Sequence, residues 1–234
     1  MDKYPVTNRN EAKRLHERAT YDVEAVHAML DSALICHIAY VVEGQPYCTP
    51  TTFWRRGNEV IWHGSAASRM LTAQVKHIDV CLTVCYLDSI VLTRSAFGHA
   101  VNYRSVMLFG RASLIEDPVE KLAESKRIID HFLPGRSDLV VPTTPLELKQ
   151  VSILKMPIDQ AVVKIRNHPA SYETSQHRGH PVWAGEILIE TRIGDAVRCK
   201  ELDPKIAMGP DLQSYRAGAR LDTTLLGIRR KNGE

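Results

Sequence analysis

The chain has 234 residues, of which 44% are hydrophobic and 24% charged, and its formal net charge is +3. This composition is typical of a globular protein with a sizeable core, and the small net charge argues against a nucleic-acid partner. No apolar run is long enough to span a bilayer and the N-terminus has no signal-peptide core, so we expect no membrane partner. The five cysteines form no Cys-x-x-Cys, which favours a reducing, cytoplasmic location.

The first half of the chain predicts an arm, a helix and a meander of strands. Residues 1–19 are polar and indicate the arm, and Thr20 is expected to cap the helix that follows. Apolar runs separated by polar turns then predict antiparallel strands. We expect these strands at about 34–42, 47–54 and 59–63.

The second half adds long strands and short helices. The strands are expected at about 80–93, 103–115 and 158–165. A short helix over about 66–75 precedes them. Asp117 and Pro118 mark a helix start, because Asp caps a helix and Pro suits its first position, and this helix should end near Leu133. Another helix should begin at Thr144 and end at Pro157.

These elements predict a mainly β protein. About six strands with few helices between them favour a closed or nearly closed antiparallel barrel. No Gly/Ser-rich or Pro-rich linker divides the chain. We therefore expect one domain over residues 1–234, with a core at about 20–168 and a C-terminal extension at about 169–234 packed on it.

Residues 60–71 have the layout of a phosphate-binding turn. They run from an apolar strand through small residues into a helix start that carries Arg69. Backbone N–H groups at a helix N-terminus attract an anion, the hydroxyls of Ser65 and Ser68 add donors, and a guanidinium adds a charged fork. An ordinary helix with Ser as its N-cap has the same pattern, and on this segment alone that reading is favoured.

Two other groups of residues are weaker candidates. His177 and His180 are spaced like a pair of metal ligands, but no carboxylate or thiol pattern completes the set, so we expect no metal site. Cys81 and Cys85 lie on the same side of a strand about 13 Å apart, which is too far for a disulfide or a shared ligand.

Four segments, in this order, resemble the pyridoxamine 5′-phosphate oxidase-like superfamily of FMN-binding split β-barrels. They are residues 35–39, 44–53, 61–70 and 102–112. With Trp183-Ala184-Gly185, the resemblance covers about residues 20–190, and it is strongest to the flavin-nucleotide-binding branch that includes nitroimidazole-resistance reductase-like proteins. It implies a six-stranded antiparallel split β-barrel with short flanking helices.

The resemblance also implies a homodimer that binds FMN at the subunit interface. The phosphate would lie against Ser65, Ser68 and Arg69. Similar proteins often have a second cation where Met70 stands here, so Arg69 would neutralise most of the phosphate charge alone. The full set of cofactor-binding residues implied by the resemblance is Pro50, Thr51, Thr52, His63, Gly64, Ser65, Ser68, Arg69, Met70, Tyr103, Arg104 and Ser105.

The individual residues of this set each have an ordinary structural explanation as well. Residues 49–52 would lie along the flavin ring, where Thr groups donate to ring atoms, but Thr and Pro also suit an edge strand. His63 is a candidate catalytic residue, although a lone strand histidine is often only packed. Strand alternation puts Tyr103 and Ser105 on one face and Arg104 on the other, and one of these faces would meet FMN.

We expect an oxidoreductase that passes electrons from a reduced nicotinamide through the flavin to a small nitro- or quinone-like acceptor. No Gly-x-Gly-x-x-Gly unit is present, so the nicotinamide would dock transiently. A non-catalytic flavin carrier is the alternative, as is the same barrel holding haem or a deazaflavin. Pyridoxamine 5′-phosphate oxidase activity itself is not expected, because the second cation is missing and the C-terminal region is unrelated.

Overall fold

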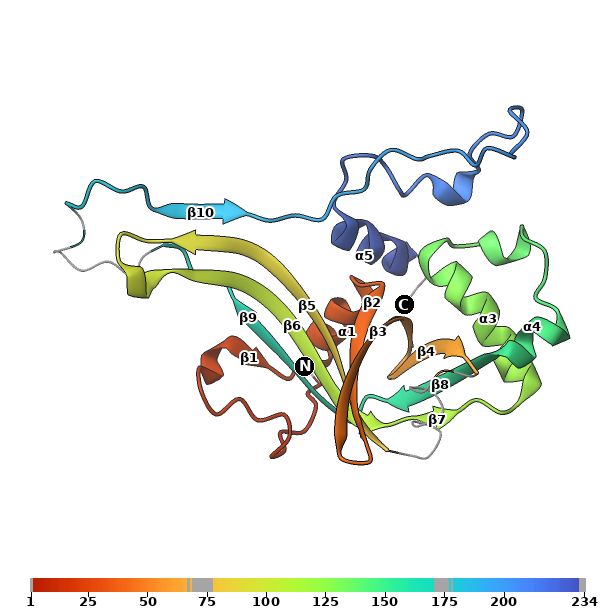
Figure 1. Cartoon of the computed structure of the whole chain (residues 1–234), viewed down its shortest axis with the longest axis horizontal. Helices are drawn as coiled ribbons and strands as arrows, with labels where there is room; N and C mark the ends of the chain where they lie inside the picture. Colours follow the sequence, from red (N-terminus) through yellow and green to blue (C-terminus); the bar gives the residue numbers. More distant parts are fainter. Residues whose placement is uncertain (1, 67, 69–77, 171–176, 178, 232–234) are drawn as a thin grey trace.

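The computed structural model describes residues 2–66, 68, 78–170, 177 and 179–231 (Figure 1). The strands are β1 (Ala19–Thr20), β2 (Ile35–Val42), β3 (Gln45–Arg56), β4 (Glu59–Ser65), β5 (Asp79–Leu92), β6 (Ala100–Arg111), β7 (Ser113–Leu114), β8 (Val151–Pro157), β9 (Gln160–Arg166) and β10 (Gly185–Leu188). The helices are α1 (Val23–Asp31), α3 (Pro118–Phe132), α4 (Pro145–Gln150) and α5 (Leu221–Lys231), with short 3₁₀ turns η1 (His16–Arg18), η2 (Ala96–Gly98), η3 (Arg136–Asp138) and η4 (Pro210–Leu212).

The described strands form one sheet in the order β1-β9-β6-β5-β2-β3-β4-β8-β7, and β10 pairs with β5. Every pairing is antiparallel. The expected mainly β, split-barrel class is confirmed, and the six expected strands correspond to β2–β6 and β9. The β7 strand falls at the end of the segment expected as a strand over 103–115, and three further strands, β1, β8 and β10, extend the sheet beyond that expectation.

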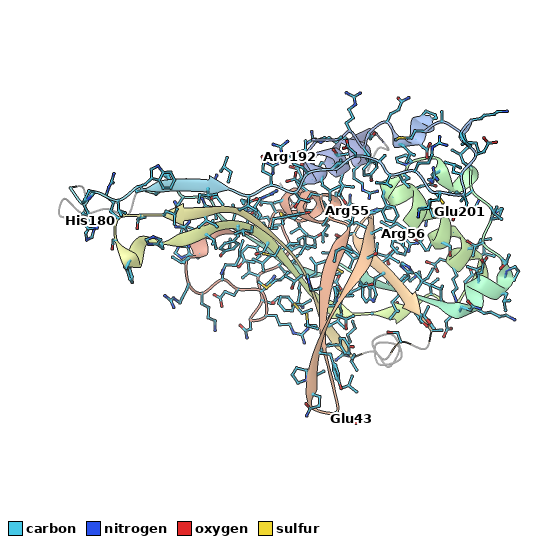
Figure 2. The ribbon with its side chains drawn as sticks, turned by 45° about the horizontal axis from the view of Figure 1, so that its top comes forward. Glu43, Arg55, Arg56, His180, Arg192 and Glu201 are labelled. Atoms are coloured by element: carbon cyan, nitrogen blue, oxygen red, sulfur yellow. The ribbon has the colours of Figure 1, made fainter. Side chains whose placement is uncertain are left out.

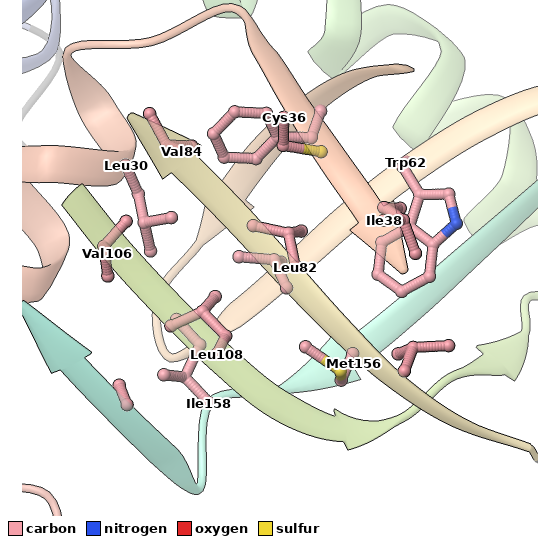
Figure 3. Packing of buried hydrophobic residues seen from close by; sticks show 14 of the residues in the cluster. Leu30, Cys36, Ile38, Trp62, Leu82, Val84, Val106, Leu108, Met156 and Ile158 are labelled. Atoms are coloured by element: carbon pink, nitrogen blue, oxygen red, sulfur yellow. The ribbon is translucent and has the colours of Figure 1, made fainter. Parts of the chain in front are cut away.

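The core lies on the inner face of the curled sheet (Figure 3). In β2, every second side chain is buried, namely Cys36, Ile38 and Tyr40, while Ile35 and His37 point outward. This alternation follows from the two-residue period of a strand. The α1 helix adds Val26 and Leu30 to the same cluster. The inner face is therefore filled by side chains, and a ligand must use the outer face or an edge of the sheet.

A smaller apolar cluster lies between the sheet and α3. Trp54 packs there with Ile61, and its Nε1 donates to Glu124 of α3 at 2.8 Å. The start of α3 is as expected, because the Asp117 side chain accepts from the Val119 N–H and Pro118 occupies the first turn. The helix thereby fixes one flank of the outer sheet face.

Two expected element boundaries are wrong. The helix that begins at Thr144 ends at Gln150, and the residues up to Pro157 form β8 instead. They pair with β4 along its whole length, so sheet hydrogen bonds outweigh the continuation of a short helix. Thr20 does not cap α1, because it pairs with β9 and Asp22 is the N-cap residue. The helix expected over 66–75 falls mostly outside the described residues.

The C-terminal segment runs back along the sheet (Figure 1). Its strand β10 pairs with β5, and α5 contacts α1 and α3. The buried Asn102 side chain ties this segment to the sheet, because its Nδ2 donates to Ser89 of β5 at 2.9 Å and to Glu186 of β10 at 3.1 Å. None of the described helices is both long and apolar enough to cross a membrane.

Candidate functional site

The outer face of β2 and β3 brings several predicted residues together. In the β2–β3 ladder, His37 lies opposite Pro50 and Ile35 lies opposite Thr52. Pro50 is exposed and Thr52 is partly buried. Because neighbouring strands are only about 4.8 Å apart, these side chains share one continuous surface. Pro50 and Thr52 thus lie on the face that the filled inner core leaves available.

His63 lies on β4 beside this surface. The Thr51 hydroxyl donates to the His63 carbonyl oxygen at 3.3 Å, which joins the two strands where their ladder ends. The His63 ring stands against the Trp54 ring with a centroid separation of 6.1 Å. Its Nδ1 is buried and has no hydrogen-bond partner among the described residues. Burial lowers the pKa of His63, so the ring is neutral at pH 7.

The turn after β4 is described only as far as Ala66 and at Ser68. Gly64 and Ser65 end the strand opposite β8, and the Ser68 N–H donates to the Ser65 carbonyl oxygen at 2.8 Å. Ser65 is exposed and Ser68 is half-buried, so both lie near the surface. Arg69 and Met70 lie outside the described residues.

Tyr103 and Ser105 lie on the same outer face as Pro50 and Thr52, but on a strand farther along the sheet. They pair with Leu87 and Cys85 of β5, and β2 separates β5 from β3. Three strand spacings of about 4.8 Å put them about 14 Å from Pro50 within one chain. The structure therefore brings Pro50, Thr51, Thr52 and His63 together and leaves Tyr103 and Ser105 on a separate part of the face.

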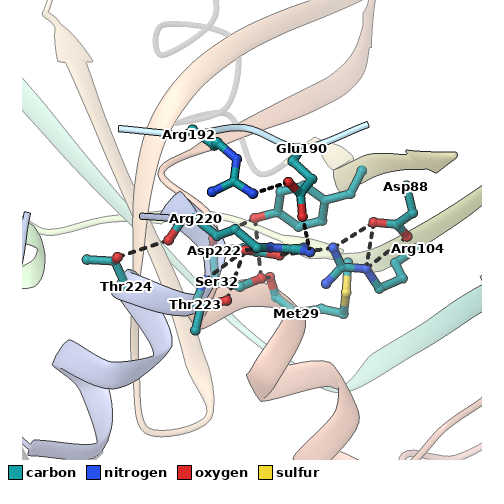
Figure 4. Close-up of polar contacts among 11 residues, drawn as sticks. Met29, Ser32, Asp88, Arg104, Glu190, Arg192, Arg220, Asp222, Thr223 and Thr224 are labelled. Atoms are coloured by element: carbon teal, nitrogen blue, oxygen red, sulfur yellow. Dashed lines mark hydrogen bonds and ion pairs between the residues drawn. The ribbon is translucent and has the colours of Figure 1, made fainter. Parts of the chain in front are cut away.

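Arg104 takes part in a chain of ion pairs that sequence reasoning missed (Figure 4). It contacts Asp88 through two nitrogens at 2.7 and 2.9 Å and Asp222 at 3.1 Å. Arg220 then holds Asp222 at 2.9 Å and Glu190 at 3.1 Å. These hydrogen bonds hold the pKa of Asp222 well below its usual range and raise that of Arg104.

The ion pairs form one end of a cavity of about 420 Å³ between the sheet and the C-terminal segment. Its other walls are largely apolar and include Ile35, Leu87 and Ile189. A second cavity of about 410 Å³ shares Ile35 and is lined by Thr52 and by Tyr215 of the C-terminal segment. The outer face around Ile35 is therefore hollowed on both sides, and the C-terminal segment walls both hollows.

The weaker candidates stay apart from these cavities. Figure 2 shows His180 at one end of the molecule, far from Arg55 and Arg56 near its middle. Within the part of the chain that the structure describes, no group of three or more His, Cys, Asp or Glu side chains is arranged to hold a metal ion. Cys81 and Cys85 are free thiols.

Comparisons with known proteins show the family and the fold. A family model described as pyridoxamine 5′-phosphate oxidase matches residues 22–165. A solved structure of the flavocytochrome Anf3 from Azotobacter vinelandii is 36% identical, with a TM-score of 0.83, over 91% of this chain and 98% of that chain. The FAD and haem binding protein from Mycobacterium smegmatis is 26% identical, with a TM-score of 0.81, over 87% of this chain and 98% of that chain.

A more distant structure shares the fold alone. It is a candidate 5-nitroimidazole antibiotic resistance protein from Bacteroides thetaiotaomicron, 20% identical with a TM-score of 0.54 over 63% of this chain and 86% of that chain. A search of curated proteins found no match. The family match covers more than half of the chain, and it contains every predicted cofactor-binding residue. This chain therefore belongs to the pyridoxamine 5′-phosphate oxidase family and has its flavin-binding split-barrel fold.

Proposed function

We propose that this protein is a redox protein that binds a flavin nucleotide and a haem. The observation that carries this proposal is the 36% identity to a flavocytochrome over nearly the whole length of both chains. The second long match is to a protein that binds FAD and haem. This second match covers 87% of the chain. The segment beyond residue 165 is longer than the part of the chain that stays unmatched, so the similarity extends past the barrel into the C-terminal segment.

The residues on the outer face fit a flavin. Pro50 has no N–H and leaves a flat apolar surface, and Thr52 adds a hydroxyl group on the same face. Thr51, in contrast, lies opposite the buried Cys36 and faces the inner side. The hydroxyls of Ser65 and Ser68 lie at the turn after β4, where a phosphate group would bind. A bound flavin supplies hydride and single-electron transfer. The chain's part is to hold the ring, and the neutral His63 ring borders it without adding charge.

We further propose a homodimer with the flavin at the interface. The outer face of β2, β3 and β5 carries small and apolar side chains such as Ala39, Cys48 and Cys81, and Ala39 lies between the two cysteines in the ladders. An exposed sheet face of this kind suits contact with a second copy of the chain. In such a dimer, Tyr103 and Ser105 of one subunit can meet the flavin of the other.

The residues also fit a haem, because two imidazoles on the outer face have ring nitrogens without hydrogen-bond partners among the described residues, and one of them, His37, lines the 420 Å³ cavity. Haem iron is commonly held by the nitrogen of a neutral histidine. His63 has a buried Nδ1 without a partner, and the His37 ring makes no hydrogen bond within the described residues. Electron transfer from a reduced nicotinamide to a small acceptor is our proposal for the activity, and a non-catalytic carrier is the competing function.

The absorption spectrum of the purified protein tests the proposal. We expect two flavin bands and an intense Soret band, both bleached or shifted by dithionite. Heat release followed by chromatography identifies the flavin as FMN or FAD, and a deazaflavin would show a different spectrum. Oxidation of NADH or NADPH with a quinone or nitro acceptor separates an oxidoreductase from a carrier. A colourless protein that takes up neither cofactor contradicts the proposal.

A further inference from the structure

The 420 Å³ cavity lies at a gap in the sheet. One edge of β5 pairs with β6 along nearly its whole length. On the other edge, β2 pairs with Val80–Thr83 and β10 pairs with Ser89–Leu92. Among the described strands, none pairs with Val84–Asp88 on that edge. The Ile189 N–H donates to the Asp88 carbonyl oxygen at 2.9 Å, which leaves Val84–Leu87 without a backbone partner there among the described residues, and all of these residues line the cavity. The cavity therefore occupies the place of a missing strand.

The walls of the cavity come from two parts of the chain. Leu34 and Ile35 belong to the region that the family model matches, whereas Ile189 and Leu221 belong to the C-terminal segment beyond it. All four are aliphatic, and they face a space open to solvent on one side. A slot of this kind suits a flat molecule with a large apolar surface.

His37 is the only histidine among the described residues that line this cavity. It is exposed on the outer face of β2, and no hydrogen bond or ion pair of its ring exists within the described part of the chain. Its nitrogens are thus free to bind a ligand. A histidine nitrogen beside an apolar slot is an arrangement that holds haem iron in many proteins.

The polar end of the cavity carries two guanidiniums, those of Arg104 and Arg220, together with the carboxylates that pair with them. Arg220 uses three nitrogens to contact Asp222 and Glu190, and its side chain is 40% exposed. A guanidinium has five N–H groups, so Arg220 keeps donors for a carboxylate. Arg104 and Arg220 also border a neighbouring cavity of about 260 Å³ that includes Arg166. A ligand with an apolar body and polar groups at one edge matches this distribution.

We propose that a haem lies in this cavity, with the His37 imidazole as an axial ligand to its iron and the C-terminal segment as its second wall. This inference rests on the proposed function, which supplies the haem but not its position. It assigns a role to the C-terminal segment, which is outside the family match at residues 22–165 but into which both long matches must extend. In this proposal His37 binds the haem, and His63 lies beside the proposed flavin site.

The first test removes the proposed ligand from the full chain. We expect His37→Gly to lose its haem, measured per chain as the pyridine haemochrome, while the flavin content stays at the wild-type level. Imidazole added to the buffer should restore haem binding and the Soret band, which a merely structural role of His37 would not explain. Haem retained with an unchanged spectrum in His37→Gly overturns the inference, as does haem lost only in His63→Gly.

The second test fills the cavity from its other wall. Ile189→Trp should lower the haem content, because Ile189 lines the cavity, whereas Ile187→Trp on β10 should not, because Ile187 lies two residues earlier and does not line it. Equal haem in the two variants contradicts the inference. Wild-type protein that binds flavin and no haem, even after incubation with hemin, removes the haem from the proposed function itself, so the two failures are distinct.

Discussion

His131 is held in an environment that excludes its charged form. Its side chain is 4% exposed, and its Nε2 has no hydrogen-bond partner among the described residues. Burial, together with the positive charges of Arg229 and Arg55, lowers the pKa of His131 to about 2. In the unfolded chain, the ring takes up a proton near its ordinary value of 6.5. Between these two values, the unfolded state binds more protons than the folded state.

This difference predicts how stability depends on pH. Above pH 6.5 the neutral His131 ring does not lower the free energy of unfolding. Below that value the free energy of unfolding falls by about 1.4 kcal/mol for each pH unit, because the unfolded chain takes up a proton that the folded chain does not. Between pH 7 and pH 5, we expect the wild type to lose about 2 kcal/mol more than His131→Leu in urea unfolding. His16→Leu, at an exposed histidine, is the control and should behave as the wild type. Parallel pH profiles for wild type and His131→Leu would count against this account.

At the scale of residues, the sequence predicts neighbours along a strand better than partners across the chain. The alternation that turns Pro50 and Thr52 outward follows from strand geometry, and the grouping of both with His63 on one face of the sheet is observed. The contact between Arg104 and Asp222 joins positions 118 apart in the sequence. No periodicity links such positions, so the ion pairs around the cavity could not be found from one sequence.

Among the elements, α3 shows how strongly a local signal can fix a boundary. The Asp117 carboxylate accepts from the Val119 N–H at 3.0 Å, and Pro118 occupies the first helical turn. The helix brings Glu124 to Trp54 and to Arg56, so its position matters for the flank of the outer face.

Removing the cap should therefore weaken the whole domain slightly. We expect Asp117→Ala to lower the free energy of unfolding by about 1 kcal/mol, because a helix N–H loses its acceptor. Asp117→Asn keeps an acceptor oxygen. It should lower the free energy of unfolding by only a few tenths of a kcal/mol, mainly because the helix-dipole interaction is weaker without the charge. Urea unfolding followed by circular dichroism measures both. An equal loss in the two variants would mean that the charge, and not the cap, stabilises α3.

The elements that the sequence misplaces are those whose secondary structure depends on pairing with a strand that is distant in the sequence. The capping box at Thr144 correctly begins α4, but nothing local ends it before Val151. The β8 strand exists because β4 offers a ladder along its whole length. Likewise, Gly185–Leu188 is a short apolar segment in the sequence and becomes β10 only because an edge of β5 is available.

The whole molecule presents an outer sheet face whose proposed role is dimerisation. Ala39 lies at its centre, opposite Cys48 on one side and Cys81 on the other. An outward arginine at this position leaves the inner core untouched but places a charge in the proposed interface.

We expect Ala39→Arg to change the protein from a dimer to a monomer in light scattering and to lose its flavin, because the proposed site needs both subunits. Val119→Arg is the matched control, since Val119 is 76% exposed on α3 and away from this face. A monomeric wild type, or a dimeric Ala39→Arg that keeps its flavin, would contradict the proposed assembly.

The uncovered stretch of β5 bears on how the molecule avoids aggregation. A free strand edge can recruit a strand from another protein and seed a fibril, and long flat edges carry the greatest hazard. Here β2 and β10 block the ladder on either side, and the Ile189 N–H donates to the Asp88 carbonyl oxygen, so in the described structure only Val84–Leu87 stays uncovered between them. An intruding strand would collide with its neighbours before it made enough hydrogen bonds to persist. The opening is therefore large enough for a small molecule, but its strand edge is too short to pair stably with another polypeptide.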